Sequence, residues 1–91
     1  MKTKLGDVQL TSRGFEYIDF KDANGHGCSL QQSSAVDDTE RGMEQPGSSF
    51  VWLGLENADE NVPDRMHLHR DQARELIVLL RHWVATGRLS E

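Results

Sequence analysis

The last quarter of the chain carries a helical pattern of apolar and polar residues. When Arg70 to Thr86 are projected at about 100° per residue, the apolar side chains fall within one arc of roughly 160°. These residues are Ala73, Leu76, Ile77, Leu79, Leu80, Trp83 and Val84, with Asp71, Glu75, His82 and Thr86 opposite. Gly87 stands where a left-handed cap is needed, and His69 and Gln72 occupy the N-cap and N3 positions. The pattern predicts an amphipathic helix over 70–86 whose apolar side needs a cover.

A period-two pattern before this segment predicts a β-hairpin. In Phe15–Lys21 the residues Ile18 and Phe20 share one face, and Phe15, Tyr17 and Asp19 share the other. Asn24-Gly25 is the strongest short hairpin signal, and the returning strand spans about 26–33, with Cys28 and Leu30 on one face. Residues 8–11 predict a further short strand.

The continuous apolar run Phe50–Leu55 predicts a central strand that is buried on both sides. Gly54 within it marks either a bulge or a close backbone approach. Met66–Leu68 predicts a short strand or an extended entry to the helix. Residues 35–49 and 56–65 predict long acidic loops, and residues 1–6 a frayed end.

These elements predict one domain over residues 1–91 with an α+β fold of two layers. A small antiparallel sheet of three to four strands is covered by one long C-terminal helix. No apolar run approaches the roughly 20 residues of a membrane span, and no hydrophobic segment follows Met1. The lone Cys28 cannot form an internal disulfide, so the expected location is a reducing cytoplasm.

The net charge of −5 is unevenly distributed along the chain. Residues 37–64 contain eight acidic residues and one arginine, a net charge of −7. Such a chain is not expected to bind nucleic acids in general, because phosphate neutralisation needs a basic surface. The acidic segments 37–44 and 56–64 either dock on a basic protein surface or only keep the chain in solution. The acidic candidates for binding are Asp37, Asp38, Glu40, Asp59 and Glu60.

Two other groups of side chains are candidates for binding. The polar run Ser29, Gln31, Gln32, Ser33 and Ser34 can hold a small ligand or a peptide backbone; otherwise it is a solvated strand face and a turn. Phe15, Tyr17 and a tryptophan such as Trp52 can form an apolar patch on the uncovered sheet face, as a partner or dimer surface.

A row of arginines lies beside the apolar arc of the helix: Arg70, Arg74, Arg81 and Arg88. It can clamp an anionic partner, or it can form a rim whose stems cover the edge of the core.

Candidate chemistry is sparse. His67 and His69 alternate and can reach one metal together with His26 or His82, although no ligand spacing supports this and one of them can simply flank the helix. Cys28 is a possible nucleophile, but its place in a strand favours a small buried apolar residue. No phosphate-binding loop and no nucleophile–base spacing is present. We therefore predict a protein that is not an enzyme and needs no metal or cofactor.

The motifs resemble a family of small uncharacterised phage and prophage proteins. The matching residues are Cys28-Ser29-Leu30-Gln31-x-Ser33-Ser34, then Trp52-Leu53-Gly54 and Arg65-Met66-His67-Leu68, within a resemblance that runs from about residue 15 to 89. Members often carry Thr where His69 stands, which removes support from a metal site there. The resemblance implies a short protein made in an infected or lysogenic bacterium.

The leading hypothesis is therefore a non-enzymatic phage-type binding protein. By analogy with other small acidic phage proteins, it occludes or modulates a bacterial protein or nucleoprotein complex, such as a CRISPR complex. The alternatives are a binder of an anionic metabolite or nucleotide and an accessory protein of the virion. An unpaired sheet edge also leaves a homodimer open.

Overall fold

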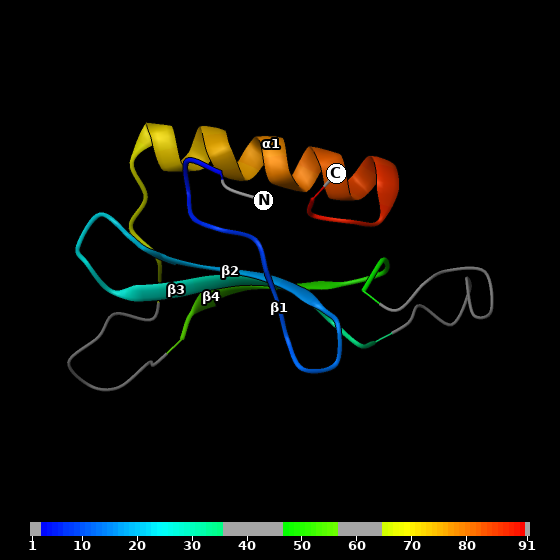
Figure 1. Cartoon of the computed structure of the whole chain (residues 1–91). Helices are drawn as coiled ribbons and strands as arrows, with labels where there is room; N and C mark the ends of the chain where they lie inside the picture. Colours follow the sequence, from blue (N-terminus) through cyan, green and yellow to red (C-terminus); the bar gives the residue numbers. More distant parts are fainter. Residues whose placement is uncertain (1–2, 36–46, 57–64, 91) are drawn as a thin grey trace.

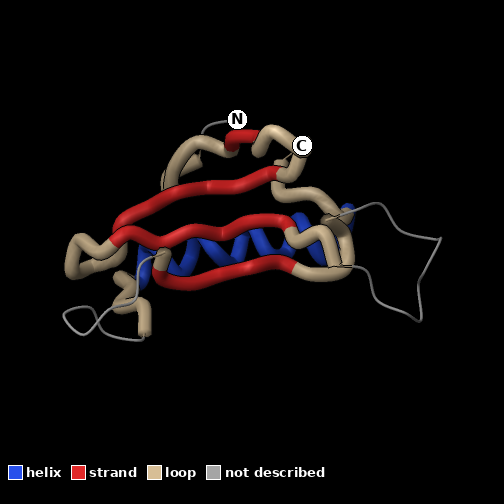
Figure 2. The backbone as a smooth tube through the Cα atoms, turned by 90° about the horizontal axis from the view of Figure 1, so that it is seen from below, coloured by secondary structure: helices blue, strands red, loops and turns tan. Residues whose placement is uncertain are grey.

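The computed structural model describes residues 3–35, 47–56 and 65–90. The strands β1 (Gln9–Leu10), β2 (Glu16–Lys21), β3 (Gly27–Gln32) and β4 (Val51–Leu55) form one antiparallel sheet in that order, and the helix α1 spans Arg70–Thr86. Figure 1 shows α1 lying along one face of the sheet, and the view from the opposite face shows it behind the β3–β4 half (Figure 2). The predicted α+β fold of two layers, with three to four antiparallel strands and a C-terminal helix, is confirmed, and the sheet has four strands.

The register of the strands gives the sheet two different faces. Ile18 lies opposite Leu30, and Leu30 opposite Leu53, so these residues share the face toward α1, which we call the inner face. The other face, called the outer face, carries the alternate residues. These are Gln9, Tyr17, Asp19, Lys21, Gly27, Ser29, Gln31, Trp52 and Gly54.

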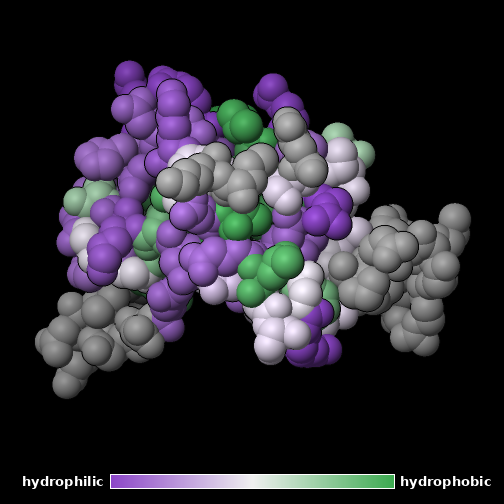
Figure 3. Space-filling view, viewed as in Figure 1, coloured by the Kyte–Doolittle hydropathy of each residue, from purple (hydrophilic) through white to green (hydrophobic). Residues whose placement is uncertain are grey.

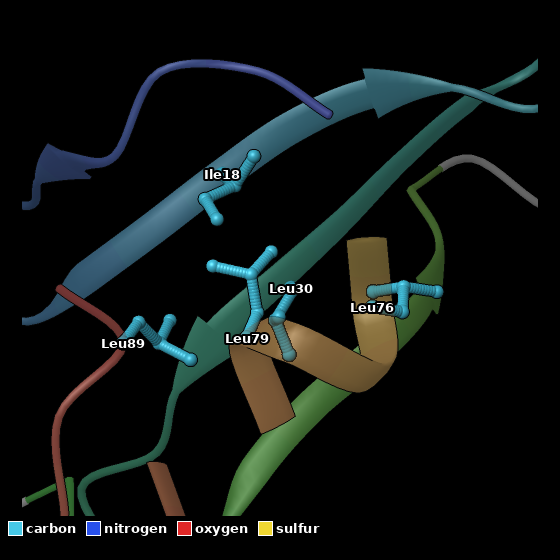
Figure 4. Packing of buried hydrophobic residues seen from close by; sticks show 5 residues of the cluster. All are labelled: Ile18, Leu30, Leu76, Leu79 and Leu89. Atoms are coloured by element: carbon cyan, nitrogen blue, oxygen red, sulfur yellow. The ribbon is translucent and has the colours of Figure 1, made fainter. Parts of the chain in front are cut away.

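The core lies between the inner face and α1. Its buried residues are Ile18, Leu30, Leu76, Leu79 and Leu89, whose side chains point toward one another from two strands, the helix and the C-terminal segment (Figure 4). In the space-filling view, hydrophobic residues show in the middle of the molecule and are surrounded by hydrophilic ones (Figure 3). Leu5 and Val8 pack against the same core. Residues 3–6 are thus not frayed as predicted, and the Thr3 hydroxyl donates to the Gly6 carbonyl at 2.6 Å.

Polar side chains fix both ends of the helix to the sheet. At the start, the Gln72 amide oxygen accepts the backbone N–H of His69 and its amide nitrogen donates to the Lys21 carbonyl. At the end, Gly87 has a φ of 79° and its N–H donates to the Trp83 carbonyl, as the predicted left-handed cap requires. The Gln32 side chain donates to the Gly87 carbonyl at 3.1 Å. The helix therefore has a fixed position along the sheet.

A buried carboxylate anchors the chain after the helix. Glu16 is 2% exposed on the inner face, and its two oxygens accept the backbone N–H groups of Leu89 and Ser90 at 2.9 and 3.0 Å. The Ser90 hydroxyl donates to the same carboxylate, and the Arg88 guanidinium lies 3.9 Å away. These contacts hold Leu89 in the core.

Asp22 closes the hairpin and connects it to the helix entry. Its carboxylate accepts the backbone N–H groups of Asn24, His26 and His67. Burial acts to raise the pKa of this carboxyl, but the three N–H donors and the nearby His26 outweigh it, so the pKa is lowered. Met66–Leu68 forms neither a helix nor a strand, so the first of the two predicted alternatives, a short strand, is not present.

The prediction for Phe50–Leu55 is wrong in one respect. The segment does form a strand, β4, but β4 is an edge of the sheet and not a buried central strand. Trp52 is 67% exposed and Leu53 is 40% exposed. Gly54 sits in a continuous register opposite Ser29, so it marks no bulge, and nothing lies within 4 Å of a Cβ built on it. The apolar composition of the run predicts burial, but the position of the strand in the sheet determines how much of it is buried.

The predicted apolar arc of the helix is also only partly buried. Leu76 and Leu79 are buried and Leu80 and Trp83 partly so, but Ile77 is 55% and Val84 77% exposed. On the polar side of the projection, Glu75 and His82 are half-buried. Glu75 lines a depression with Lys4 and Leu5, and the His82 ring lies 3.1 Å from the Ser90 carbonyl. The N-terminal segment and the C-terminal residues thus cover a polar flank of α1 and leave the opposite flank open.

The buried stripe of the helix can be tested by paired alanine substitutions. We expect Leu76→Ala to lower the free energy of unfolding by about 2–5 kcal/mol, because it leaves a cavity in the core. Val78→Ala, at a neighbouring position that is 58% exposed, should change it by less than about 0.5 kcal/mol. Denaturant unfolding followed by circular dichroism measures both, and equal losses would show that the helix is rotated differently.

Candidate functional site

The outer face of the sheet brings together aromatic and neutral polar side chains. Tyr17, Gln31 and Trp52 form one row across β2, β3 and β4. In the next row Asp19, Ser29 and Gly54 lie side by side. Because side chains in register on neighbouring strands are about 5 Å apart, each row is a contiguous surface.

This face differs from the inner one in its exposure. Along β2 and β3 every inner-face residue is buried, whereas every outer-face residue is half-buried or exposed. The indole of Trp52 is two-thirds exposed, and the Tyr17 hydroxyl donates to the Gln9 side chain at 3.0 Å. Gly54 leaves open space beside Trp52. The outer face is therefore an open surface that carries an exposed aromatic ring.

Two carboxylates meet at one end of this surface. The backbone N–H of Glu56, just after β4, donates to the Gly27 carbonyl, and a Cβ built on Gly27 would lie 3.3 Å from Glu56 Oε2. A hydrogen bond to the Asp19 side chain, then burial and the negative charge of Asp19, raise the pKa of Glu56, while Lys21 opposes the shift. The end of the outer face thus brings two carboxyl groups together, with Lys21 nearby.

The structure separates the predicted polar run into two groups. Ser29 and Gln31 lie on the outer face beside Trp52, as a binding surface requires. Ser33 is 4% exposed, and its hydroxyl accepts the Ala35 N–H at 3.1 Å. Gln32 is buried on the inner face, where its side chain bridges Glu16 and Gly87. Ser33 and Gln32 therefore support the fold and do not face a ligand.

The arginine row lies on the other side of the molecule. Arg70, Arg74 and Arg81 are exposed on α1, and Arg74 pairs with Asp71 at 2.6 Å. Because α1 covers the inner face, these guanidinium groups do not share a surface with Ser29 and Gln31. The arginine row and the polar residues Ser29 and Gln31 therefore do not form one site around an anion. The acidic candidates Asp37, Asp38, Glu40, Asp59 and Glu60 lie outside the described residues.

Histidine and cysteine are placed in structural roles. Cys28 is fully buried, and burial raises the pKa of its thiol, so a nucleophilic thiolate is disfavoured. His67 lies 3.2 Å from the Asn24 side chain, and His82 approaches Ser90 near the far end of α1. Within the described part of the chain, no three His, Cys, Asp or Glu residues gather around a common point that could hold a metal.

Sequence reasoning missed the acidic part of this surface. The alternation of residues puts Asp19 on the same face as Tyr17, but it does not identify Glu56 as the neighbour of Asp19. Glu56 follows β4, a strand that the sequence predicts in the middle of the sheet. Asn24-Gly25 predicts the hairpin but not its register: a two-residue turn at Asn24-Gly25 would put Asp19 opposite Leu30, whereas the structure has a three-residue turn, Ala23–Gly25, that puts Asp19 beside Ser29. The pairing of β3 with β4 has no comparable sequence signal.

Comparisons with protein-family models, with curated proteins and with solved structures found no match. Among the residues that the structure describes, no helix is both long and apolar enough to cross a membrane.

The contact between Asp19 and Glu56 predicts a pH-dependent stability. Because the folded-state pKa of Glu56 lies above its ordinary value of 4.5, the folded chain is stabilised by a proton that is lost as the pH rises above that value. We expect Glu56→Gln to gain thermal stability over the wild type as the pH rises from 4.5 to 7. Thermal unfolding across this range measures the difference.

The matched variant is Asp19→Asn, which removes the other charge of the same pair. Both substitutions remove the same repulsion, the one between Asp19 and Glu56. The double variant should therefore gain no more thermal stability than the better single variant. Additive gains, or a difference from the wild type that does not change with pH, would show that the two carboxylates do not interact.

Proposed function

We propose that this chain is a non-enzymatic binding protein that engages a protein partner through the outer face of its sheet. The observation that carries the proposal is Trp52, which projects from β4 with 67% of its surface exposed, in one row with Tyr17 and Gln31. Tryptophan and tyrosine dominate the binding energy of protein interfaces, because each buries a large rigid surface and keeps one polar group for a hydrogen bond.

The charge of this surface favours a basic partner. Asp19 and Glu56 lie at its end, and a lysine or arginine of the partner would replace their mutual repulsion with an ion pair. The acidic segments 37–44 and 56–64 flank β4 in the sequence and give this part of the chain a net negative charge. Electrostatic steering then speeds the encounter with a basic surface.

The resemblance to phage and prophage proteins suggests where the partner is found. Of the residues that carry it, Ser29, Gln31 and Trp52 have side chains on the outer face, and none of the three is a buried residue of the core. We therefore propose a bacterial protein or nucleoprotein complex as the target, bound in the cytoplasm of the host cell. Defence complexes such as those of CRISPR are within this class by analogy alone.

An anionic metabolite or nucleotide is less well supported as the ligand. Its phosphate groups would need positive charge, whereas the described charges at this end of the outer face are Asp19 and Glu56, with Lys21 as one nearby cation. The exposed arginines of α1 lie across the molecule.

The proposal is tested by affinity capture from bacterial lysate with quantitative mass spectrometry. We expect Trp52→Ala to weaken binding of the specific partner by about 30-fold, corresponding to roughly 2 kcal/mol for an aromatic anchor. Ser29→Arg should also abolish capture, because it places bulk and positive charge in the middle of the outer face.

Leu10→Ala is the control, since Leu10 is equally exposed but lies on β1. It should retain every partner of the wild type. If Trp52→Ala and Ser29→Arg retain the same partners as Leu10→Ala, the outer face is not the binding surface.

A further inference from the structure

We propose that two copies of this chain pair through β4, in an antiparallel register centred on Leu53. The two sheets would then form one continuous sheet of eight strands, with both α1 helices on the same face. This inference goes beyond the proposed function: it concerns the edge of the sheet, and it shares only Trp52 with the residues of the outer face named above.

The backbone of β4 has a free row of hydrogen-bonding groups. The Phe50 carbonyl accepts the Ser33 N–H, and the Glu56 N–H donates to the Gly27 carbonyl. Since bonded and non-bonded positions alternate along an antiparallel pair, residues 50, 52, 54 and 56 bond to β3, and residues 51, 53 and 55 direct their N–H and C=O groups outward. No described strand pairs with that edge. Such an edge accepts a further strand.

The side chains of β4 are complementary to a second copy of themselves. A two-fold axis at Leu53 places Leu53 opposite its own equivalent and Val51 opposite Leu55 of the second copy, which continues the apolar inner face. On the outer face it places Trp52 opposite Gly54 of the second copy. Nothing lies within 4 Å of a Cβ built on Gly54, so the indole has room to lie over that glycine.

The exposed flank of α1 adds to the same surface. Lys4 and Leu5 lie against one flank of the helix, on the β1 side of the sheet, so Ile77 and Val84 project from the opposite flank, on the β4 side. Strands in a sheet are about 4.8 Å apart, so two helices that each lie over a β3–β4 half (Figure 2) would come within about 10 Å of each other. That is the ordinary distance between packed helices, and Ile77 would lie between them.

The area of this surface is large enough for a specific dimer. Five exposed apolar residues contribute: Phe50, Trp52, Leu53, Ile77 and Val84. At roughly 150–250 Å² for an aromatic and about 60–120 Å² for an aliphatic side chain, their exposed parts amount to about 300–500 Å² per copy. Since apolar atoms form about 60% of an interface, two copies would bury roughly 1,000–1,600 Å² in total, within the range of specific complexes.

A strand from an unrelated protein can also add to such an edge. The second copy is favoured because a single register satisfies the backbone groups, places Trp52 over a glycine and brings the two exposed helix flanks together. An unrelated strand would not by itself cover Ile77 and Val84.

Light scattering after size exclusion tests the proposal on the full chain at micromolar to millimolar concentration. The wild type should show twice the chain mass of 10.3 kDa. Leu53→Lys should shift the mass to a single chain, because a lysine pair at the two-fold axis repels. Ile77→Lys, on the helix flank, should raise the dissociation constant of the dimer at least tenfold. This variant leaves β4 unchanged, so it controls for loss of the dimer through misfolding of β4 in Leu53→Lys. Leu10→Lys, at the opposite edge of the sheet, should stay dimeric.

The register is tested by Leu53→Cys under mild oxidation. Residues in a hydrogen-bonded antiparallel pair have Cα atoms about 5.5 Å apart, which suits a disulfide, so this variant should cross-link to a dimer while Leu10→Cys does not. A wild type that is monomeric at every concentration, a mass above two chains, or a Leu53→Lys variant that remains dimeric would overturn the proposal.

A dimer of the wild type in which Leu53→Cys does not cross-link would overturn the register. The proposed function is tested independently, because monomeric Leu53→Lys keeps the outer face and should still capture a partner if that proposal is correct.

Discussion

The fold depends on the burial of one stripe of α1 against one face of the sheet. A single helix is about 10 Å wide, whereas four strands span nearly twice that width, so α1 can cover only one half of one face. Leu76 and Leu79 form one buried cluster with Ile18 on β2 and Leu30 on β3, and the N-terminal Leu5 and Val8 pack against this cluster. The outer face, the β4 edge and the outer flank of the helix are therefore left for other contacts.

Polar side chains determine where the helix lies. An apolar stripe alone permits sliding and rotation, because hydrophobic contacts have little directionality. Gln72 binds one end of α1 to β2, Gln32 binds the other end to β3, and Glu16 holds the segment after the helix. Each of these groups has backbone partners, so the burial of Gln32 and Glu16 brings specificity without unpaired polar atoms. The result is a helix whose exposed flank, with Ile77 and Val84, points consistently to the β4 side.

The sequence predicts the elements well and their environments less well. The helix bounds, its Gly87 cap and the Asn24-Gly25 hairpin follow from local chemistry, and each is present as predicted. Burial of Glu16 was not predictable, because the N–H groups that it accepts lie more than 70 residues away along the chain. The placement of β4 at an edge was missed for a related reason, because strand order is a long-range property. The apolar run FVWLGL is compatible with a buried central strand and also with an edge strand that binds a partner.

The candidate site follows the same division. Ser29, Gln31 and Trp52 were selected from the sequence, and the register unites them, whereas Ser33 and the arginines were selected on local pattern and are placed elsewhere. Alternation along one strand is visible in a sequence, but which rows adjoin across strands is not. Asp19 and Glu56 became neighbours only through the β3–β4 pairing.

The central claim, that α1 covers one face of the sheet and leaves the other open, is tested most directly by the two tryptophans. Trp52 lies on the outer face, and Trp83 is partly buried with its indole N–H donating to the Gly47 carbonyl at 2.9 Å. Acrylamide quenching of the single-tryptophan variants Trp83→Phe and Trp52→Phe, at a dilution where copies do not associate, compares the two rings. The account predicts that Trp52 is quenched nearly as efficiently as free tryptophan and Trp83 much less. Equal protection of the two rings would contradict it.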